Sequence, residues 1–114
     1  DISHDGWLVK TDSEGVMQDT HWGSGLFGYF PSYALGNIYS GQLLACMESQ
    51  IPDWRTQISE GNFQKVKQWL INNVHSNGNL YNAPELIQKI TGTDLNVEPF
   101  LKYLNQKYSK LYEF

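Results

Sequence analysis

The chain has 114 residues, 40% of them apolar and 18% charged, which is one domain's worth of sequence with the composition of a globular protein. Its net charge is −4, and its eight Lys and Arg form no basic run, which argues against a nucleic-acid-binding surface and a basic membrane-surface helix. No segment reaches the roughly 18 apolar residues that a membrane span needs, so we expect neither nucleic acid nor a membrane as a partner.

The cysteine and aromatic content bears on the compartment of the protein and on the kind of core or surface that it has. Cys46 is the only cysteine, so no disulfide can form within the chain, which fits a reducing compartment. No signal peptide is visible, and because the chain opens with Asp1 rather than Met, we expect a piece of something longer. Four Trp and seven Tyr predict either a thick core or a large face meant for another surface.

The first third of the chain has little regular pattern. Residues 1–14 are polar and predict an extended N-terminal segment. Residues 15–31 hold Gly15, Gly23, Gly25 and Gly28 among aromatic residues. Because glycine adopts turns that other residues cannot, this stretch predicts an irregular loop, ordered if its aromatic side chains are buried.

A long helix is predicted over residues 32–50. Pro31 suits its first turn because the φ angle of proline is fixed near the helical value. Gly36 and Gly41 each cost about 1 kcal/mol relative to Ala in a helix interior, so we expect this helix to lie very close to another backbone. Its many apolar residues leave little polar face, which predicts a central, buried helix.

Two shorter helices are predicted next. Pro52 opens a short helical turn that carries Trp54. Apolar residues at amphipathic spacing predict a helix over residues 63–75. His75 stands at its end, where a cation is mildly favoured, so we interpret it as structural.

The last third of the chain predicts two more helices. Asn82 with Glu85 resembles a capping box, and the helix that it starts is closed by Gly92. Apolar residues recur every three or four residues over residues 97–111, which predicts a helix and is the cleanest amphipathic pattern in the chain. No strand alternation is convincing, so the predicted fold is an all-α, multi-helix unit led by the irregular Gly- and aromatic-rich loop.

Asp19 and His21 stand two residues apart, and in an extended chain this spacing points both side chains to one side. A carboxylate beside an imidazole can raise the pKa of the ring or fix its tautomer. The pair is compatible with acid–base or substrate-binding chemistry, with a metal pair, or with a buried polar pair that only holds the loop together.

Other histidine, tyrosine and cysteine residues give weaker evidence for a functional site. The three histidines include no His-Glu-x-x-His motif and no pair four residues apart, so a self-contained zinc site is not expected. Tyr29 and Tyr33 could donate to a carboxylate or an oxyanion, or they could simply pack as aromatic residues. Cys46 lies within a predicted helix without a basic neighbour, which indicates a core residue rather than a nucleophile.

One segment is similar to a known family signature. Residues 15–22, Gly-Val-Met-Gln-Asp-Thr-His-Trp, resemble the Gly-x-x-Gln-Asp-x-His-Trp signature of the M32 metallocarboxypeptidases, the carboxypeptidase Taq family. Residues 28–39 resemble that family's next block, and shorter blocks from Trp69 to Tyr108 follow in the family's order. We therefore divide the chain into a poorly matched segment, residues 1–14, and a C-terminal helical subdomain, residues 15–114.

The resemblance implies a cytoplasmic, commonly homodimeric enzyme that removes single residues from peptide C-termini with a zinc or cobalt ion. A metal-activated water would attack the peptide carbonyl, with a Glu as base. The family's metal ligands, a His-Glu-x-x-His helix and a downstream Glu, belong to a part upstream of this signature that the chain does not contain.

The chain would then be the C-terminal part of such an enzyme, with the missing N-terminal part as its partner. It would hold no metal ligand and no catalytic residue, and would be inactive alone. The resemblance implies that six of its residues line the substrate groove: Gln18, Asp19, His21, Trp22, Tyr29 and Tyr33.

Two alternatives remain open from the sequence. The chain could be a non-catalytic helical module that binds peptide or protein through its Tyr and Trp residues, or a stand-alone metal enzyme that uses Asp19, His21 and another His. A part of a larger enzyme would leave a substantial apolar surface bare. An interaction module would have a complete core, and a stand-alone metal enzyme would retain stoichiometric zinc.

Overall fold

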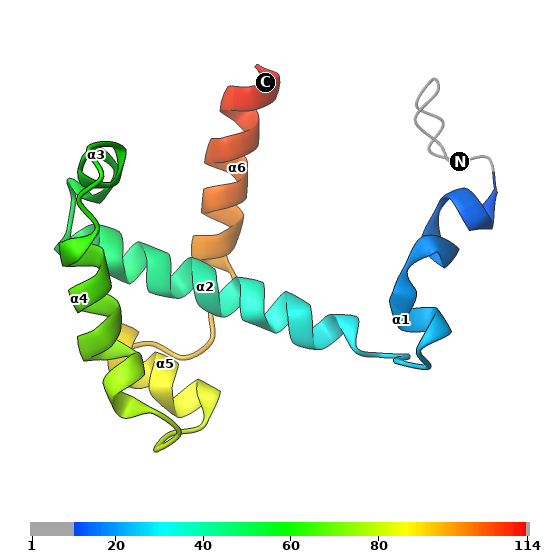
Figure 1. Cartoon of the computed structure of the whole chain (residues 1–114), viewed down its shortest axis with the longest axis horizontal. Coiled ribbons are helices and arrows are strands. Elements are labelled where there is room, and N and C mark those ends of the chain that lie inside the picture. The colour runs from blue at the N-terminus through cyan, green and yellow to red at the C-terminus, as the bar shows by residue number, and fades with distance from the viewer. Residues whose placement is uncertain (1–10, 114) are drawn as a thin grey trace. The chain divides into compact units, whose positions relative to one another are not determined.

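The computed structural model describes residues 11–113, and over that range the fold is all-α, as predicted (Figure 1). Among these residues, no helix combines the length and hydropathy needed to cross a bilayer. The elements in chain order are η1 (Asp12–Glu14), η2 (Val16–Gln18), α1 (Thr20–Gly23), α2 (Phe30–Gln50), α3 (Trp54–Ser59), α4 (Gln64–Asn73), η3 (His75–Asn77), α5 (Ala83–Thr91) and α6 (Glu98–Tyr112).

The chain divides into two compact units, one ending at Tyr33 and the other beginning at Ala34. The described part of the first unit holds η1, η2, α1 and the first turn of α2. The rest of α2 and all later helices form the second unit. The division at residue 15 made from the family resemblance remains a prediction. The extended segment predicted for residues 1–14 falls mostly outside the described residues, and residues 12–14 form η1.

Helix α2 begins two residues earlier than predicted, with Pro31 inside its first turn. Only Gly41, Gln42 and Met47 of this helix are buried, and residues 32–37 are exposed. The prediction of a buried central helix is therefore wrong for its N-terminal part. Apolar content alone does not bury a helix, because burial requires a neighbouring element to cover its faces.

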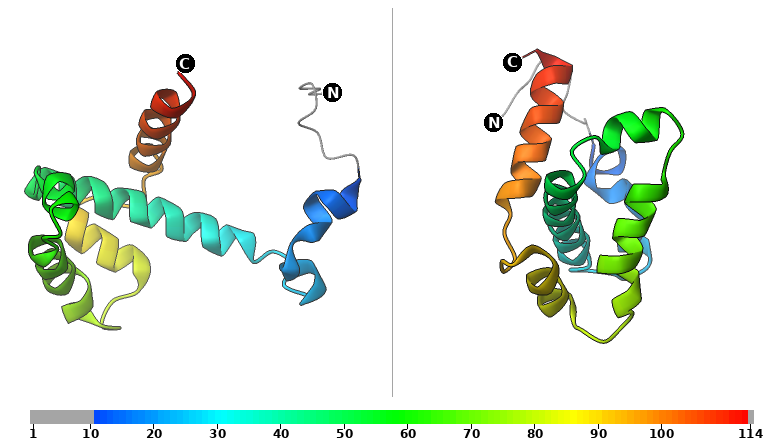
Figure 2. Two further views of the ribbon diagram at one scale, coloured as in Figure 1. Left: turned by 45° about the horizontal axis from the view of Figure 1, so that its top comes forward. Right: turned by 90° about the vertical axis from the view of Figure 1, so that its left-hand side faces the viewer.

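The close backbone contact predicted from glycine occurs at Gly41. A Cβ at this position would lie 2.7 Å from the Cβ of Phe100 at the start of α6, and 2.8 Å from its Cα. Viewed along α2, α6 and α4 lie on opposite sides of it (Figure 2). Gly36 does not share this role, because within the described part of the chain nothing beyond its neighbours and the backbone of its own helix lies within 4 Å of the corresponding Cβ position.

A buried amide joins α2 to the loop before α6. Gln42 is 3% exposed, and its Nε2 donates to the carbonyl of Asp94 (2.9 Å) and, more weakly, to Thr93 Oγ1 (3.4 Å). Its Oε1 accepts from the backbone N–H of Asn96 at 2.9 Å. A buried amide with both ends satisfied fixes the loop that leads into α6.

The core of the second unit lies between the C-terminal half of α2 and α4. Met47, Ile51 and Trp69 are buried together. The Trp69 indole N–H donates to Gln50 Oε1 at 2.9 Å, so its polar atom is satisfied. Full burial of a side chain such as Met47 or Ile51 stabilises a fold by about 1.5–3 kcal/mol. Partly buried residues surround the cluster: Leu43, Leu44, Cys46, Trp54, Val66, Leu70, Val74 and Ile90.

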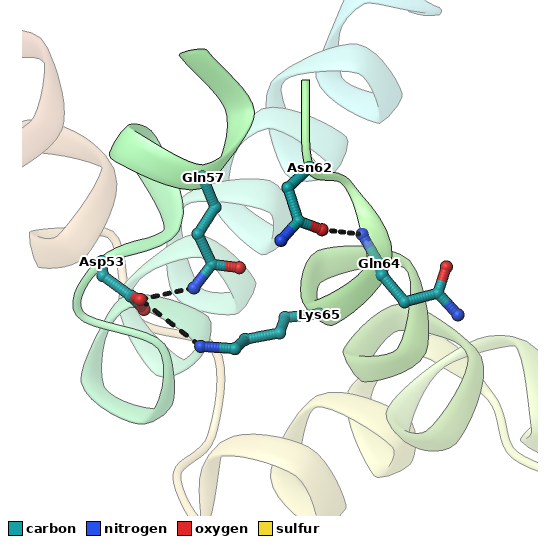
Figure 3. Close-up of polar contacts among 5 residues, drawn as sticks. All are labelled: Asp53, Gln57, Asn62, Gln64 and Lys65. Carbon is teal, nitrogen blue, oxygen red and sulfur yellow. Dashed lines mark hydrogen bonds and ion pairs between the residues drawn. The ribbon is translucent and has the colours of Figure 1, made fainter. Parts of the chain in front are cut away.

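Polar contacts fix the corner between α3 and α4 (Figure 3). The carboxylate of Asp53 accepts from Gln57 Nε2 and from Lys65 Nζ. The bond from Gln57, with a smaller contribution from Lys65, lowers the pKa of Asp53 below its ordinary value. The backbone N–H of Gln64 donates to Asn62 Oδ1 at 3.3 Å, which satisfies one free donor at the start of α4.

The caps predicted for α5 are present. Asn82 Oδ1 accepts from the Glu85 N–H at 3.0 Å, and Glu85 Oε2 accepts from the Asn82 N–H at 3.2 Å. Gly92 ends the helix with φ +75°, a conformation that favours glycine. Helix α6 is amphipathic as predicted but contains no buried residue, and Leu111 is 62% exposed.

Candidate functional site

The candidate site lies in the glycine- and aromatic-rich segment, which is more regular than the predicted loop. Residues 16–18 form η2 and residues 20–23 form α1. Asp19 has extended backbone angles and is the N-cap of α1. The prediction of a wholly irregular loop missed this helix because four residues are too few to show a helical period.

Asp19 and His21 are in direct contact. Asp19 Oδ1 accepts from the backbone N–H of His21 at 2.8 Å and also forms a hydrogen bond with His21 Nδ1. The contact was predicted from alternation along an extended chain, and that reason is wrong because His21 lies within α1. It arises from helix capping, which turns the Asp19 side chain back over the second helical residue.

These hydrogen bonds set the electrostatics of the pair. The bond from the His21 backbone N–H, followed by the bond from its ring, lowers the pKa of Asp19 below the ordinary value of 3.8. Asp19 is therefore ionised at neutral pH. Because the carboxylate accepts from Nδ1, the other ring nitrogen, Nε2, is the one left for a further partner.

Aromatic side chains surround the imidazole. The centroid of the His21 ring lies 4.8 Å from that of Phe30 and 5.6 Å from those of Tyr29 and Tyr33. Tyr29 and Tyr33 meet edge to face at 5.2 Å. The His21 side chain is only 18% exposed, whereas Tyr29 and Tyr33 are about half exposed. The ring is thus held on several sides while the two tyrosines face outward.

A shallow pocket of about 390 Å³ lies beside the pair. It is lined by Gly15, Gln18, Asp19, Trp22 and Phe30. Trp22 packs against Phe27 and Phe30, with ring centroids 5.5 and 5.6 Å apart.

Of the six residues predicted to line a groove, Gln18, Asp19 and Trp22 line this pocket. His21, Tyr29 and Tyr33 form the adjoining ring cluster. Phe30 belongs to both groups and was not selected from the sequence. The signal for it was the helix start at Pro31, which places residues 29, 30 and 33 within one turn.

The residues present do not fit a metal centre. Between residues 11 and 113, no three His, Cys, Asp or Glu side chains are grouped closely enough to hold an ion. His4 lies outside the described residues, and His75 is exposed in η3. The Cys46 Sγ donates to the Ile90 carbonyl at 3.5 Å, which agrees with a packed thiol rather than a metal ligand.

Comparison with known proteins places this site in context. Residues 5–108 match the family described as carboxypeptidase Taq (M32) metallopeptidase. The chain is similar to carboxypeptidase 1 of Bacillus subtilis, with 45% identity over 94% of this chain and 21% of that protein. It is 38% identical to thermostable carboxypeptidase 1 of Thermus thermophilus, over 96% of this chain and 21% of that protein.

The structural comparison agrees. The fold matches a solved structure of an M32 carboxypeptidase from Deinococcus radiodurans R1 with a TM-score of 0.80 and 34% identity. That match covers 96% of this chain and 22% of the other. The chain therefore spans about a fifth of the length of the relatives that it matches.

Proposed function

Since this chain belongs to the carboxypeptidase Taq (M32) metallopeptidase family, we propose that it forms part of a metallocarboxypeptidase and supplies one wall of its substrate groove. The enzyme would remove single residues from peptide C-termini. The groove wall would consist of the pocket and the adjoining ring cluster. The observation that carries this proposal is the Asp19–His21 pair, held by a helix cap among aromatic rings.

Substrate binding requires a fixed donor or acceptor, and the pair supplies one. Its capping bond orients the Asp19 carboxylate, the carboxylate orients the imidazole, and the ring contacts restrict the imidazole further. Preorganised groups bind more tightly than mobile ones because less conformational freedom is lost on binding.

The groups around the pair suit an anionic target. His21 Nε2 donates when the ring carries both protons, and the hydroxyl groups of Tyr29 and Tyr33 are donors beside it. A peptide's terminal carboxylate, or the oxyanion formed when its scissile carbonyl is attacked, accepts from such donors. We assign His21, Tyr29 and Tyr33 to one or the other of these oxygens.

The metal chemistry of this proposal lies outside the chain. A zinc or cobalt ion would be held by ligands in a preceding part of a cytoplasmic, homodimeric parent enzyme. It follows that this chain by itself does not hydrolyse peptides.

The first test assays the purified chain alone. N-blocked peptides with a free C-terminal carboxylate are incubated with the chain and added Zn²⁺ or Co²⁺, and free amino acids are measured. We expect no release above the metal-only control. Release that a chelator abolishes would overturn the claim of inactivity.

The second test examines the groove wall in a working enzyme. The chain replaces its matched segment in carboxypeptidase 1 of Bacillus subtilis, and the folded chimera is assayed as wild type, His21→Ala and His75→Ala. His75 is an exposed histidine of η3, so His75→Ala is the matched control. We expect His21→Ala to lower kcat/KM by about tenfold to a hundredfold, as loss of one charge-assisted hydrogen bond does. Equal activity of the two variants would remove His21 from the groove.

A further inference from the structure

The pocket beside the Asp19–His21 pair has a definite chemical character. Trp22 and Phe30 contribute aromatic walls, Gln18 an exposed amide and Asp19 a carboxylate, and among the described residues that line the pocket none is a cation. A volume of about 390 Å³ is ample for one amino-acid side chain.

The hydrogen bonds between Asp19 and His21 use only one of the two carboxylate oxygens. Oδ1 accepts from both the backbone N–H and the ring of His21. Across residues 11–113, Oδ2 has no hydrogen-bond or ion-pair partner, and the side chain is 37% exposed. The capping bonds hold the carboxylate in place, and Asp19 lines the pocket, so its side chain is a fixed anionic acceptor for a group bound there.

The nature of a bound side chain follows from this acceptor. An apolar side chain would displace water from an ionised carboxylate without replacing its hydrogen bonds, which is unfavourable. A guanidinium or ammonium group would instead supply the missing donor, and its charge would be attracted to the aromatic faces. Arginine fits best, because its planar group stacks on aromatic rings while donating in its own plane.

The pocket and the ring cluster share Phe30, and Asp19 of the pocket contacts His21 of the cluster. If the ring cluster receives the terminal carboxylate of a peptide, the side chain lying in the pocket belongs to the same terminal residue. We propose that this pocket receives the cationic side chain of a C-terminal Arg or Lys, with Asp19 as the specificity-determining residue. This assignment rests on the function proposed above.

The test compares substrates of nearly equal shape in the chimera. One peptide pair ends in Arg or citrulline, and a second pair ends in Lys or norleucine. We expect kcat/KM to favour the cationic member by about threefold to tenfold, the range for a partly exposed ion pair with an aromatic contribution. Asp19→Asn keeps a good N-cap but removes the charge, so it should bring both ratios close to one. Asp12→Asn, which changes an exposed acid of η1, should leave them unchanged.

The outcomes separate the two proposals. Equal rates for Arg and citrulline peptides in an active chimera, or ratios that Asp19→Asn does not change, would overturn the specificity and leave the proposed function intact. A folded chimera that releases no residue from any peptide would overturn the proposed function, and the specificity with it.

Direct binding provides a second measurement if the chimera does not fold. The chain is titrated with N-acetyl-arginine and with N-acetyl-citrulline while its amide and indole NMR signals are followed. We expect shifts at Gly15, Asp19 and Trp22 with the arginine derivative that are at least threefold larger than with citrulline. Equal shifts, or none with either compound, would contradict the proposal.

Discussion

The contacts that order the chain within the first unit differ in kind from those within the second. The second unit has a buried cluster of Met47, Ile51 and Trp69 and a buried amide at Gln42. In the first unit, none of the described side chains is fully buried, and order comes from a helix cap and stacked rings. The difference indicates that buried packing contributes more to the stability of the second unit than to that of the first.

The first unit exposes large aromatic side chains, as the second unit does at Phe63 and Tyr112. Phe27 is 75% exposed and Tyr33 55% exposed in the first unit. A dense aromatic content predicted either a thick core or a face for another surface, and these exposures favour the face. Contact with another surface would bury these aromatic side chains, which are exposed in the chain by itself.

The largest expected effect comes from removing the core of the second unit. Trp69→Ala should lower the free energy of unfolding by about 3–5 kcal/mol, because it opens a cavity among buried side chains and leaves Gln50 without its donor. Urea unfolding followed by circular dichroism measures it. Phe63→Ala, at a residue 59% exposed, is the matched control and should change stability by less than about 0.5 kcal/mol. Equal losses for the two variants would contradict the assigned core.

The two glycines of α2 provide a sharper comparison within one helix. Gly41→Ala should destabilise the chain by about 1–3 kcal/mol, because the added methyl group meets the backbone of Phe100. Gly36→Ala should stabilise it by about 0.5–1 kcal/mol, because the described residues leave open space there and alanine favours a helix. Thermal unfolding of both variants checks the signs. Stabilisation by both changes would mean that α2 and α6 do not approach as described.

The smallest effect concerns the cap in the first unit. The pKa of Asp19 is lower in the folded state than in the unfolded state, so the stabilisation due to its ionised form is present above the unfolded pKa. It is lost as the pH falls through the folded pKa, below 3.8. An NMR titration of the His21 amide should show this midpoint, and Asp19→Asn should remove it. A midpoint above 3.8 would contradict the capping bonds.

Much of the fold could be predicted because local signals and tertiary packing agree. The capping box at Asn82, the left-handed Gly92 and the periodicity of α6 each act within a few residues, and each is present. Which helix faces are covered could not be predicted in the same way. The exposed start of α2 shows that a run of apolar residues does not determine its neighbours.

The candidate site was located from its motif, but its geometry was not. The contact between Asp19 and His21 was expected from an extended strand and instead depends on a helix of four residues. The place of Phe30 beside His21 depends on the turn between α1 and α2, which holds positive-φ glycines at Gly25 and Gly28. Such turns arrange side chains in a way that no simple period describes.

The Gln42 amide cannot be reversed without cost. Its Nε2 faces the carbonyl of Asp94 and its Oε1 faces the N–H of Asn96, so a flipped amide would set oxygen against oxygen and hydrogen against hydrogen. Glutamate has the same shape but offers no hydrogen for the carbonyl, and its charge would be enclosed there. At this position, the replacement of one nitrogen by oxygen is therefore enough to weaken the hold of α2 on the loop that leads into α6.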